Sequence, residues 1–137
     1  MDVSMIEEQI AALLAALNHK SAPALGALFT EDAEFVSILG TRMRGRRDIE
    51  AQHDGHFKLG LLAGSAFESK NVEVTLLGAD VARCIVEWRR LRLPDASERT
   101  LPPGDGIFTL VAVRGDGGWR FAAAQNTQVV VPPARSS

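Results

Sequence analysis

The sequence predicts one α+β domain in which N-terminal helices pack on one face of a mostly antiparallel sheet. Apolar residues recur at helical spacing up to about residue 61, whereas strand-like segments fill residues 66–131. The segment Gly115-Asp116-Gly117-Gly118 is a strong signal for a hairpin between the last two strands. Helices gathered on one face of an antiparallel sheet are typical of the α+β class.

The length of the chain is consistent with one domain. A chain of 137 residues can enclose a single hydrophobic core, and we find neither an internal repeat nor a linker. We therefore expect one domain over residues 1–131, followed by a C-terminal tail over residues 132–137.

Three helices are expected in the first part of the chain. The first carries an apolar stripe at a spacing of three and four residues, formed by Ile6, Ile10, Leu13, Leu14 and Leu17. Ser21 is expected to cap a second, short helix with Pro23 in its first turn. The buried face of that helix is expected to consist of Leu25, Leu28 and Phe29. The third helix is expected over Arg46–Leu61, with His53 and Phe57 on one face.

The strands are expected as one short pair and four longer segments. After a turn at residues 30–32, the expected spans are Glu34–Leu39, Met43–Gly45, Ala66–Leu77, Val81–Leu93, Gly106–Arg114 and Trp119–Val131. Long strands that bend around three helices leave a gap that the helices do not fill. A small-molecule site is expected in that gap.

Alternation along the longest strand predicts which of its side chains face the helices, because successive side chains point to opposite faces of a sheet. The row with Cys84, Val86 and Trp88 is more apolar than the row with Glu87 and Arg89. We therefore expect Trp88 to form a wall of the pocket. The opposite arrangement, with the charged pair inside, stays open because alternation alone does not say which row is buried.

Alternation also predicts which face of the last strand is turned toward the helices. The row with Trp119, Phe121 and Gln125 contains the large apolar groups and is expected inside. Gln125 is then a polar group at the deep end of the pocket, able to orient a carbonyl or hydroxyl, or a buried amide satisfied by the backbone. Asn126 is expected on the other face, where it can bond across a dimer, although this orientation also stays open.

Composition excludes several functional classes. The net charge of −2 provides no general field for nucleic acid or anionic membranes. The single cysteine, Cys84, does not allow a disulfide framework and fits a reducing compartment. An acidic N-terminus and the lack of an apolar run of about 20 residues predict a cytoplasmic protein without a membrane span. The excess of arginine over lysine indicates a GC-rich bacterial genome.

Neither a GxGxxG motif after a strand nor a metal-ligand cluster is present in the sequence, so no cofactor and no metal are expected.

Three segments resemble the nuclear transport factor 2-like superfamily, also described as SnoaL-like or cystatin-like. Leu28–Phe35 reads LFTEDAEF, Arg44–Ile49 reads RGRRDI, and Gly118–Thr127 reads GWRFAAAQNT. The last segment resembles the SgcJ/EcaC subfamily, in which a histidine on the third helix, here His53, is also familiar. The resemblance implies a cone of three helices on a strongly curved six-stranded sheet, with a pocket in the cone. It also implies a homodimer packed sheet to sheet.

The resemblance leaves the activity open, because the superfamily includes steroid isomerases, dehydratases, polyketide cyclases and non-catalytic binding modules. The isomerases use a tyrosine on the first helix and an aspartate on the first strand. This chain contains no tyrosine, and Leu13 lies at about the tyrosine position. Ser37 lies at the position of the aspartate. Leucine cannot donate a hydrogen bond and serine cannot act unassisted as that base, so the isomerase mechanism is not expected here.

His53 is the candidate catalytic residue, as a general base on the pocket wall, and the alternative is a structural histidine between helix and sheet. Candidate ligand-binding residues are Leu13, Phe35, Phe57, Trp88, Gln125 and Asn126. His56 lies about 60° from the face of His53 and lacks the further ligands that a metal site needs. The basic run from Arg42 to Arg47 is interpreted as a solvated hairpin and helix start.

Two functional interpretations remain. The chain is either an isomerase-, cyclase- or dehydratase-like enzyme of secondary metabolism that acts on a hydrophobic small molecule, or a non-catalytic dimeric module that binds a ligand or a protein. The sequence does not decide between them, because the volume of the pocket depends on the curvature of the sheet.

Overall fold

The structure, a computed structural model, describes residues 2–130. Its helices are α1 (Asp2–His19), α2 (Ala22–Gly26) and α3 (Arg46–Lys58). Its strands are β1 (Phe29–Val36), β2 (Arg42–Arg44), β3 (Ser65–Leu76), β4 (Val81–Arg92), β5 (Gly104–Gly115) and β6 (Gly118–Gln128). The predicted α+β class, with N-terminal helices and a six-stranded, mostly antiparallel sheet, is confirmed. The predicted tail, residues 132–137, lies outside the described residues.

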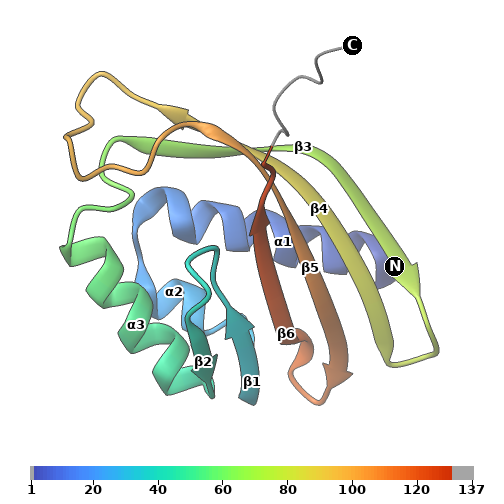
Figure 1. Cartoon of the computed structure of the whole chain (residues 1–137). Coiled ribbons are helices and arrows are strands. Elements are labelled where there is room, and N and C mark those ends of the chain that lie inside the picture. Colours follow the sequence, from blue (N-terminus) through green and yellow to red (C-terminus); the bar gives the residue numbers. More distant parts are fainter. Residues whose placement is uncertain (1, 131–137) are drawn as a thin grey trace.

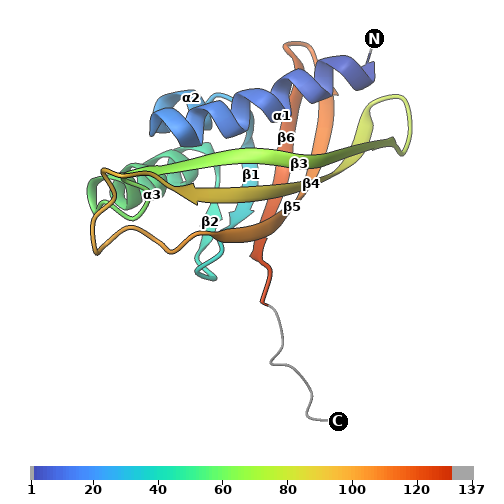
Figure 2. The same cartoon turned by 90° about the horizontal axis from the view of Figure 1, so that it is seen from above.

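The six strands form one sheet in the order β2-β1-β6-β5-β4-β3. Neighbouring strands are antiparallel except for β1 and β6, which run parallel. The long strands curve around α1, and α2 and α3 lie beside the short β1–β2 pair (Figure 1). Seen from above, the helices lie on one side of the sheet (Figure 2). All three helices therefore lie on the concave face of the sheet, with α1 under the long strands and α2 and α3 near the short strands.

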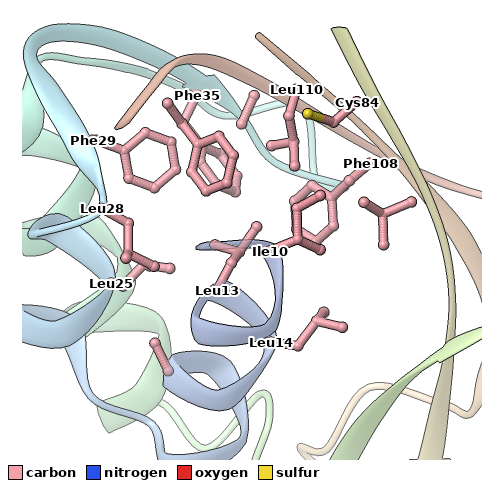
Figure 3. Packing of buried hydrophobic residues seen from close by; sticks show 14 of the residues in the cluster. Ile10, Leu13, Leu14, Leu25, Leu28, Phe29, Phe35, Cys84, Phe108 and Leu110 are labelled. Atoms are coloured by element: carbon pink, nitrogen blue, oxygen red, sulfur yellow. The ribbon is translucent and has the colours of Figure 1, made fainter. Parts of the chain in front are cut away.

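The helix α1 packs on the sheet through its predicted apolar stripe. Ile6, Ile10, Leu13, Leu14 and Leu17 are all buried. Figure 3 shows Leu13 of α1 directed into a cluster that includes Phe35, Phe108 and Leu110 from the strands. At the end of α1, the Asn18 amide forms a two-way bridge to the edge strand. Its Nδ2 donates to Phe67 O at 3.0 Å, and its Oδ1 accepts from Phe67 N at 2.6 Å.

The start of α2 agrees with its sequence signal. The Ser21 Oγ accepts a hydrogen bond from Ala24 N at 3.3 Å, and Pro23 lies in the first turn. This is the expected N-cap, which satisfies one of the backbone donors that a helix start leaves without a partner.

The prediction was wrong for the first strand. Phe29 was expected on the second helix and residues 30–32 in a turn, but β1 already begins at Phe29. Phe29 pairs with Phe121 of β6, and the two rings lie 5.7 Å apart. A local irregularity follows before regular pairing resumes at Glu34. The parallel partner β6 decides this start, and no local signal in the sequence indicates it.

The last strand also differs from its simple alternation. Val111 of β5 pairs with Ala123, whereas Ala112 pairs with Phe121, so Ala122 is an extra residue in β6. A bulge of this kind shifts the following side chains to the opposite face. Phe121 therefore faces the helices as predicted, but beyond the bulge Ala124 and Asn126 are buried, and Gln125 and Thr127 are exposed. The predicted faces of Gln125 and Asn126 were wrong.

The strand β4 keeps a regular alternation. Cys84, Val86 and Trp88 are fully buried, whereas Glu87 and Arg89 are exposed, as predicted. The same row ends with Arg90, which is only 1% exposed. Within residues 2–130, no helix is both long and apolar enough to cross a membrane.

Candidate functional site

A cavity lies between the concave face of the sheet and the C-terminal part of α3. Its lining comes from α1, β1 and the turn after it, α3 and the segment after it, and the strands β3 to β6. The lining residues are Leu17, Phe35, Ser37, Ile38, Leu39, His53, His56, Phe57, Leu61, Leu62, Phe67, Arg90, Leu101, Phe108 and Asn126. Of these, Leu39 is 55% exposed and lies at the rim.

The cavity is small. The centre of a water-sized sphere can move through about 60 Å³ of it. One water needs roughly 10–15 Å³ by this measure, so the space corresponds to roughly four to six waters. It is smaller than the few hundred cubic ångströms of a drug-sized pocket, yet it is not a filled core. A molecule of roughly six to ten heavy atoms matches this space.

His53 lies on the buried face of α3 and is 6% exposed. Its Nδ1 lies 2.7 Å from Ile49 O, one turn earlier in the helix. A carbonyl oxygen only accepts, so the proton of the neutral ring is on Nδ1 and the lone pair is on Nε2. Nε2 has no hydrogen-bond partner among the described residues. His53 therefore offers the cavity one acceptor.

The environment keeps this ring neutral. Burial lowers the pKa of His53 from 6.5 to about 4, the bond to Ile49 O partly opposes this, and the neighbouring His56 lowers the pKa further. The Phe35 ring lies edge-on to the imidazole, with centroids 4.7 Å apart. No carboxylate contacts the ring in the described chain, so nothing compensates an imidazolium there. At neutral pH His53 is an uncharged base.

Asn126 offers the cavity a donor with a fixed orientation. Trp88 Nε1, which can only donate, bonds to Asn126 Oδ1 at 2.8 Å. The amide nitrogen of Asn126 is therefore directed away from the indole. The two residues lie on strands separated by β5, and the indole crosses that strand above Gly106, where a Cβ atom would overlap the ring. Glycine at this position lets Trp88 reach Asn126.

Ser37 follows β1 and adds a second donor. Its Oγ accepts from Leu39 N at 3.2 Å and from Thr41 N at 3.3 Å. The hydroxyl proton is left for another acceptor. Ser37 is 9% exposed and lines the cavity.

Arg90 is the charged group of the cavity wall. Its Nε and Nη2 donate to Pro102 O at 3.1 and 2.7 Å. Its Cζ lies 5.4 Å from the centroid of the Trp88 ring and 5.9 Å from that of Phe67. Burial lowers the pKa of this guanidinium, which nonetheless stays charged at neutral pH. Arg90 was not among the residues predicted for the site, although it continues the predicted inward row of β4.

The structure brings together some of the predicted site residues and separates others. His53, Phe35, Phe57 and Asn126 line the cavity. Trp88 is fully buried behind the lining and orients Asn126. Leu13 belongs to the hydrophobic core under α1 and does not line the cavity. Gln125 faces the outside of the sheet, because the bulge at Ala122 changes its face.

The remaining candidates of the sequence lie apart from this chemistry. His56 lines the cavity near its rim, with its ring 6.1 Å from that of His53. Within residues 2–130, no three histidine, cysteine or acidic side chains are close enough to hold a metal ion. In the basic run, Arg42 bonds to Glu34 at 2.7 Å, and both side chains are largely exposed. Cys84 is buried, and this burial raises the pKa of its thiol to about 11.

Solved structures share this fold along nearly the whole chain. A cystatin-like protein of unknown function from Caulobacter vibrioides is 26% identical, with a TM-score of 0.82, and the match covers 94% of this chain and 90% of that one. A cystatin-like domain of unknown function from Nostoc punctiforme is 25% identical, with a TM-score of 0.81 and coverage of 95% and 78%. A candidate scytalone dehydratase from Novosphingobium aromaticivorans is 20% identical, with a TM-score of 0.77 and coverage of 98% and 90%. This third likeness concerns the fold alone.

No functionally curated protein matches the sequence. The family model that describes the SnoaL-like domain matches residues 1–125, which include α1, the cavity residues of α3 and most of β6. The chain therefore belongs to the SnoaL-like domain family.

Proposed function

We propose that this protein is a small-molecule enzyme that moves a proton on a compact, largely apolar substrate with a carbonyl or hydroxyl oxygen. Isomerases, cyclases and dehydratases of secondary metabolism carry out reactions of this kind. One observation carries the proposal: His53 is neutral, its Nδ1 is committed to Ile49 O, and it lines a cavity with mostly apolar walls. The fold likeness to a candidate scytalone dehydratase is consistent with it.

The groups around the cavity have complementary roles in such a reaction. A C–H proton beside the carbonyl passes to His53 Nε2, and the electron pair of that bond moves to the carbonyl oxygen. The amide of Asn126 and the hydroxyl of Ser37 are donors for the oxygen as it gains charge. His53 then returns the proton to another carbon of the substrate. The low pKa of His53, about 4, makes it a weak base, so the proposed substrate has an acidic C–H bond.

Isomerisation of cyclohex-3-enone to its conjugated isomer tests the proposal. This ketone has an acidic C–H bond between the carbonyl and the double bond, and it is small enough for the cavity. We expect enzyme-dependent isomerisation, followed by absorbance, to fall by about 10²- to 10⁴-fold in His53→Gln. The matched control is His19→Gln, on the exposed end of α1. Equal rates for wild type and His53→Gln would contradict the assignment of the base.

A non-catalytic binding module is the second candidate, and one observation favours it. Nδ1 of His53 bonds to a neutral carbonyl rather than to a carboxylate, which would stabilise the imidazolium during proton transfer. If the protein is a binding module, we expect cyclohexanone to shift the NMR signals of the Trp88 indole and the Asn126 amide. Cyclohex-3-enone is then bound without being isomerised. Binding is then retained in His53→Gln.

We also propose a subfamily, a cellular location and an oligomeric state for this protein. We place it in the SgcJ/EcaC subfamily because of the segment Gly118–Thr127 and His53, and we propose a bacterial, cytoplasmic homodimer. The dimer is supported by half-buried apolar side chains on the outer face of the sheet, which are Ile85, Ile107, Val111 and Val113. Analytical ultracentrifugation of Val111→Arg tests this interface. We expect Val111→Arg to be a monomer and the control Asp116→Lys to stay a dimer. A Val111→Arg variant that stays a dimer refutes this interface.

A further inference from the structure

We propose that the cavity recognises a small organic carboxylate, whose negative group binds to Arg90 while its apolar body lies among the aromatic side chains. The inference rests on the proposed small-molecule site and names the chemical class of its ligand. Its basis is a buried guanidinium whose hydrogen bonds are incomplete.

The contacts of Arg90 leave one corner of its guanidinium without a partner. The edge formed by Nε and Nη2 donates to Pro102 O, and Nη2 also lies 3.3 Å from Gln128 Oε1. Nη1, at the opposite corner, is buried and has no hydrogen-bond partner in the described part of the chain. The whole residue is 1% exposed and belongs to the cavity lining. A buried donor without a partner is costly, and a ligand oxygen at Nη1 removes that cost.

The charge of Arg90 is also uncompensated. Its two oxygen partners, Pro102 O and Gln128 Oε1, are neutral. The nearby carboxylate of Asp105 is on the other face of the sheet, 3.3 Å from Arg89 and 3.5 Å from Lys70. No acidic side chain forms an ion pair with Arg90 within residues 2–130. Buried charges in proteins are normally paired, so an anionic ligand supplies the partner that residues 2–130 do not.

The position of Arg90 gives the ligand two polar ends. Asn126 pairs with Phe108, which pairs with Val86, so these three residues form one row across the sheet. Arg90 lies four residues from Val86 along β4, which is roughly 13 Å along the strand. The long side chain of Arg90 shortens this span, because its Nη2 lies 3.3 Å from Oε1 of Gln128, two residues after Asn126 on the same strand. A molecule whose carboxylate binds to Arg90 therefore extends toward Asn126 and His53, which line the same cavity.

The walls between these groups select an apolar body. Phe35, Phe67 and Phe108 contribute rings to the lining, and Leu61 and Leu101 close it from two loops. The volume of about 60 Å³ matches roughly six to ten heavy atoms. Benzoate, with nine heavy atoms, is the appropriate probe. Benzamide has nearly the same shape and no charge, so it serves as the matched neutral probe.

The experiment compares the Kd of benzoate and of benzamide by NMR titration of the Trp88 indole and Asn126 amide signals, in a low-chloride buffer. We expect wild type to bind benzoate about 10- to 100-fold more tightly, because hydrogen bonds to charged groups are the stronger ones. Arg90→Met keeps the aliphatic stem and removes the charge, so it is expected to abolish this preference while benzamide still binds. Arg89→Met, on the outer face, is the matched control and is expected to keep the preference.

The outcomes separate this inference from the proposed function. If benzamide binds as tightly as benzoate, or if Arg90→Met keeps the preference, carboxylate recognition is overturned and the small-molecule site stands. If neither probe shifts these signals, the proposed site fails and this inference fails with it. Arg90→Lys guards against misfolding of the methionine variant, because it keeps the charge without the planar fork. It is expected to retain part of the preference.

Discussion

The substitution Gly106→Ala tests the support of the cavity most directly. A methyl group at this position would come within 2.5 Å of Trp88 Cη2, and closer still to two other ring carbons. Ordinary carbon–carbon contacts are about 3.5–4.0 Å, so the ring would have to retreat by at least about 1 Å. Trp88 is fully buried, and its hydrogen bond to Asn126, at 2.8 Å, depends on its present position.

The expected destabilisation has two sources. Overpacking of a core costs about 1–3 kcal/mol, and a buried donor that loses its partner costs about 1–3 kcal/mol. The lower backbone entropy of alanine in the unfolded chain offsets about 0.4–1 kcal/mol. We therefore expect a loss of about 3 kcal/mol. With an unfolding entropy of about 2.1 cal/mol/K per residue, this lowers the Tm of a 137-residue chain by about 10 °C.

Urea and thermal unfolding measure this effect against Gly104→Ala. Gly104 lies two residues earlier in β5, and the nearest atom to a Cβ there is the flexible Gln128 Nε2 at 3.5 Å. The control is expected to change the free energy of unfolding by less than about 0.5 kcal/mol. If Gly106→Ala is as stable as Gly104→Ala, the indole does not need this glycine and our account of Asn126 orientation is refuted. In a Trp88→Leu background, the cost of Gly106→Ala is expected to shrink.

Three further predictions concern His53, Asn126 and Cys84. Folding lowers the pKa of His53 from 6.5 to about 4. Between pH 6.5 and pH 4 the histidine is therefore protonated in the unfolded chain and neutral in the folded chain, so it makes the folded protein less stable as the pH falls through this range. The urea stability of His53→Gln should therefore depend less on pH by up to about 3 kcal/mol, and parallel profiles for wild type and mutant would contradict this. Asn126→Ala should lower the free energy of unfolding by about 1–3 kcal/mol, because it leaves the Trp88 donor without a partner. Gln125→Ala should change the free energy of unfolding by less than about 0.5 kcal/mol. Equal losses for the two variants in urea unfolding would argue against the bulge at Ala122. Because the thiol pKa of Cys84 is about 11, we expect the folded protein to resist iodoacetamide at pH 8 and the urea-unfolded protein to react. Mass spectrometry measures the labelling, and rapid labelling of the folded chain would mean that the thiol is not buried.

Much of the fold could be predicted from the sequence where local patterns are strong. The stripe from Ile6 to Leu17 predicted α1 because one apolar helix face must be buried. The alternation from Cys84 to Trp88 predicted the inner face of β4. His53 and Phe57 were found as cavity residues because they lie four residues apart on one helix face. These features depend on neighbours in the chain.

Other features depend on how one segment pairs with another, and only the tertiary structure decided them. The start of β1 at Phe29 depends on its pairing with β6. The extra residue Ala122 exchanged the roles of Gln125 and Asn126, since one inserted residue shifts a period of two by one face. Arg90 lies in a row that the sequence predicted as inward, but its burial requires the Pro102 carbonyl from the loop after β4.

The sequence by itself determined that helices would cover an apolar sheet face, because hydrophobic periodicity is a local property of the chain. The tertiary structure decided which polar groups meet in the remaining space: a neutral His53, an amide held by Trp88 and a guanidinium whose Nη1 has no hydrogen-bond partner among the described residues. Their meeting depends on sheet curvature, one bulge and one glycine that lets an indole cross a strand. No segment of the sequence contains that information alone, because each of these features is a relation between paired strands and not a pattern within one strand.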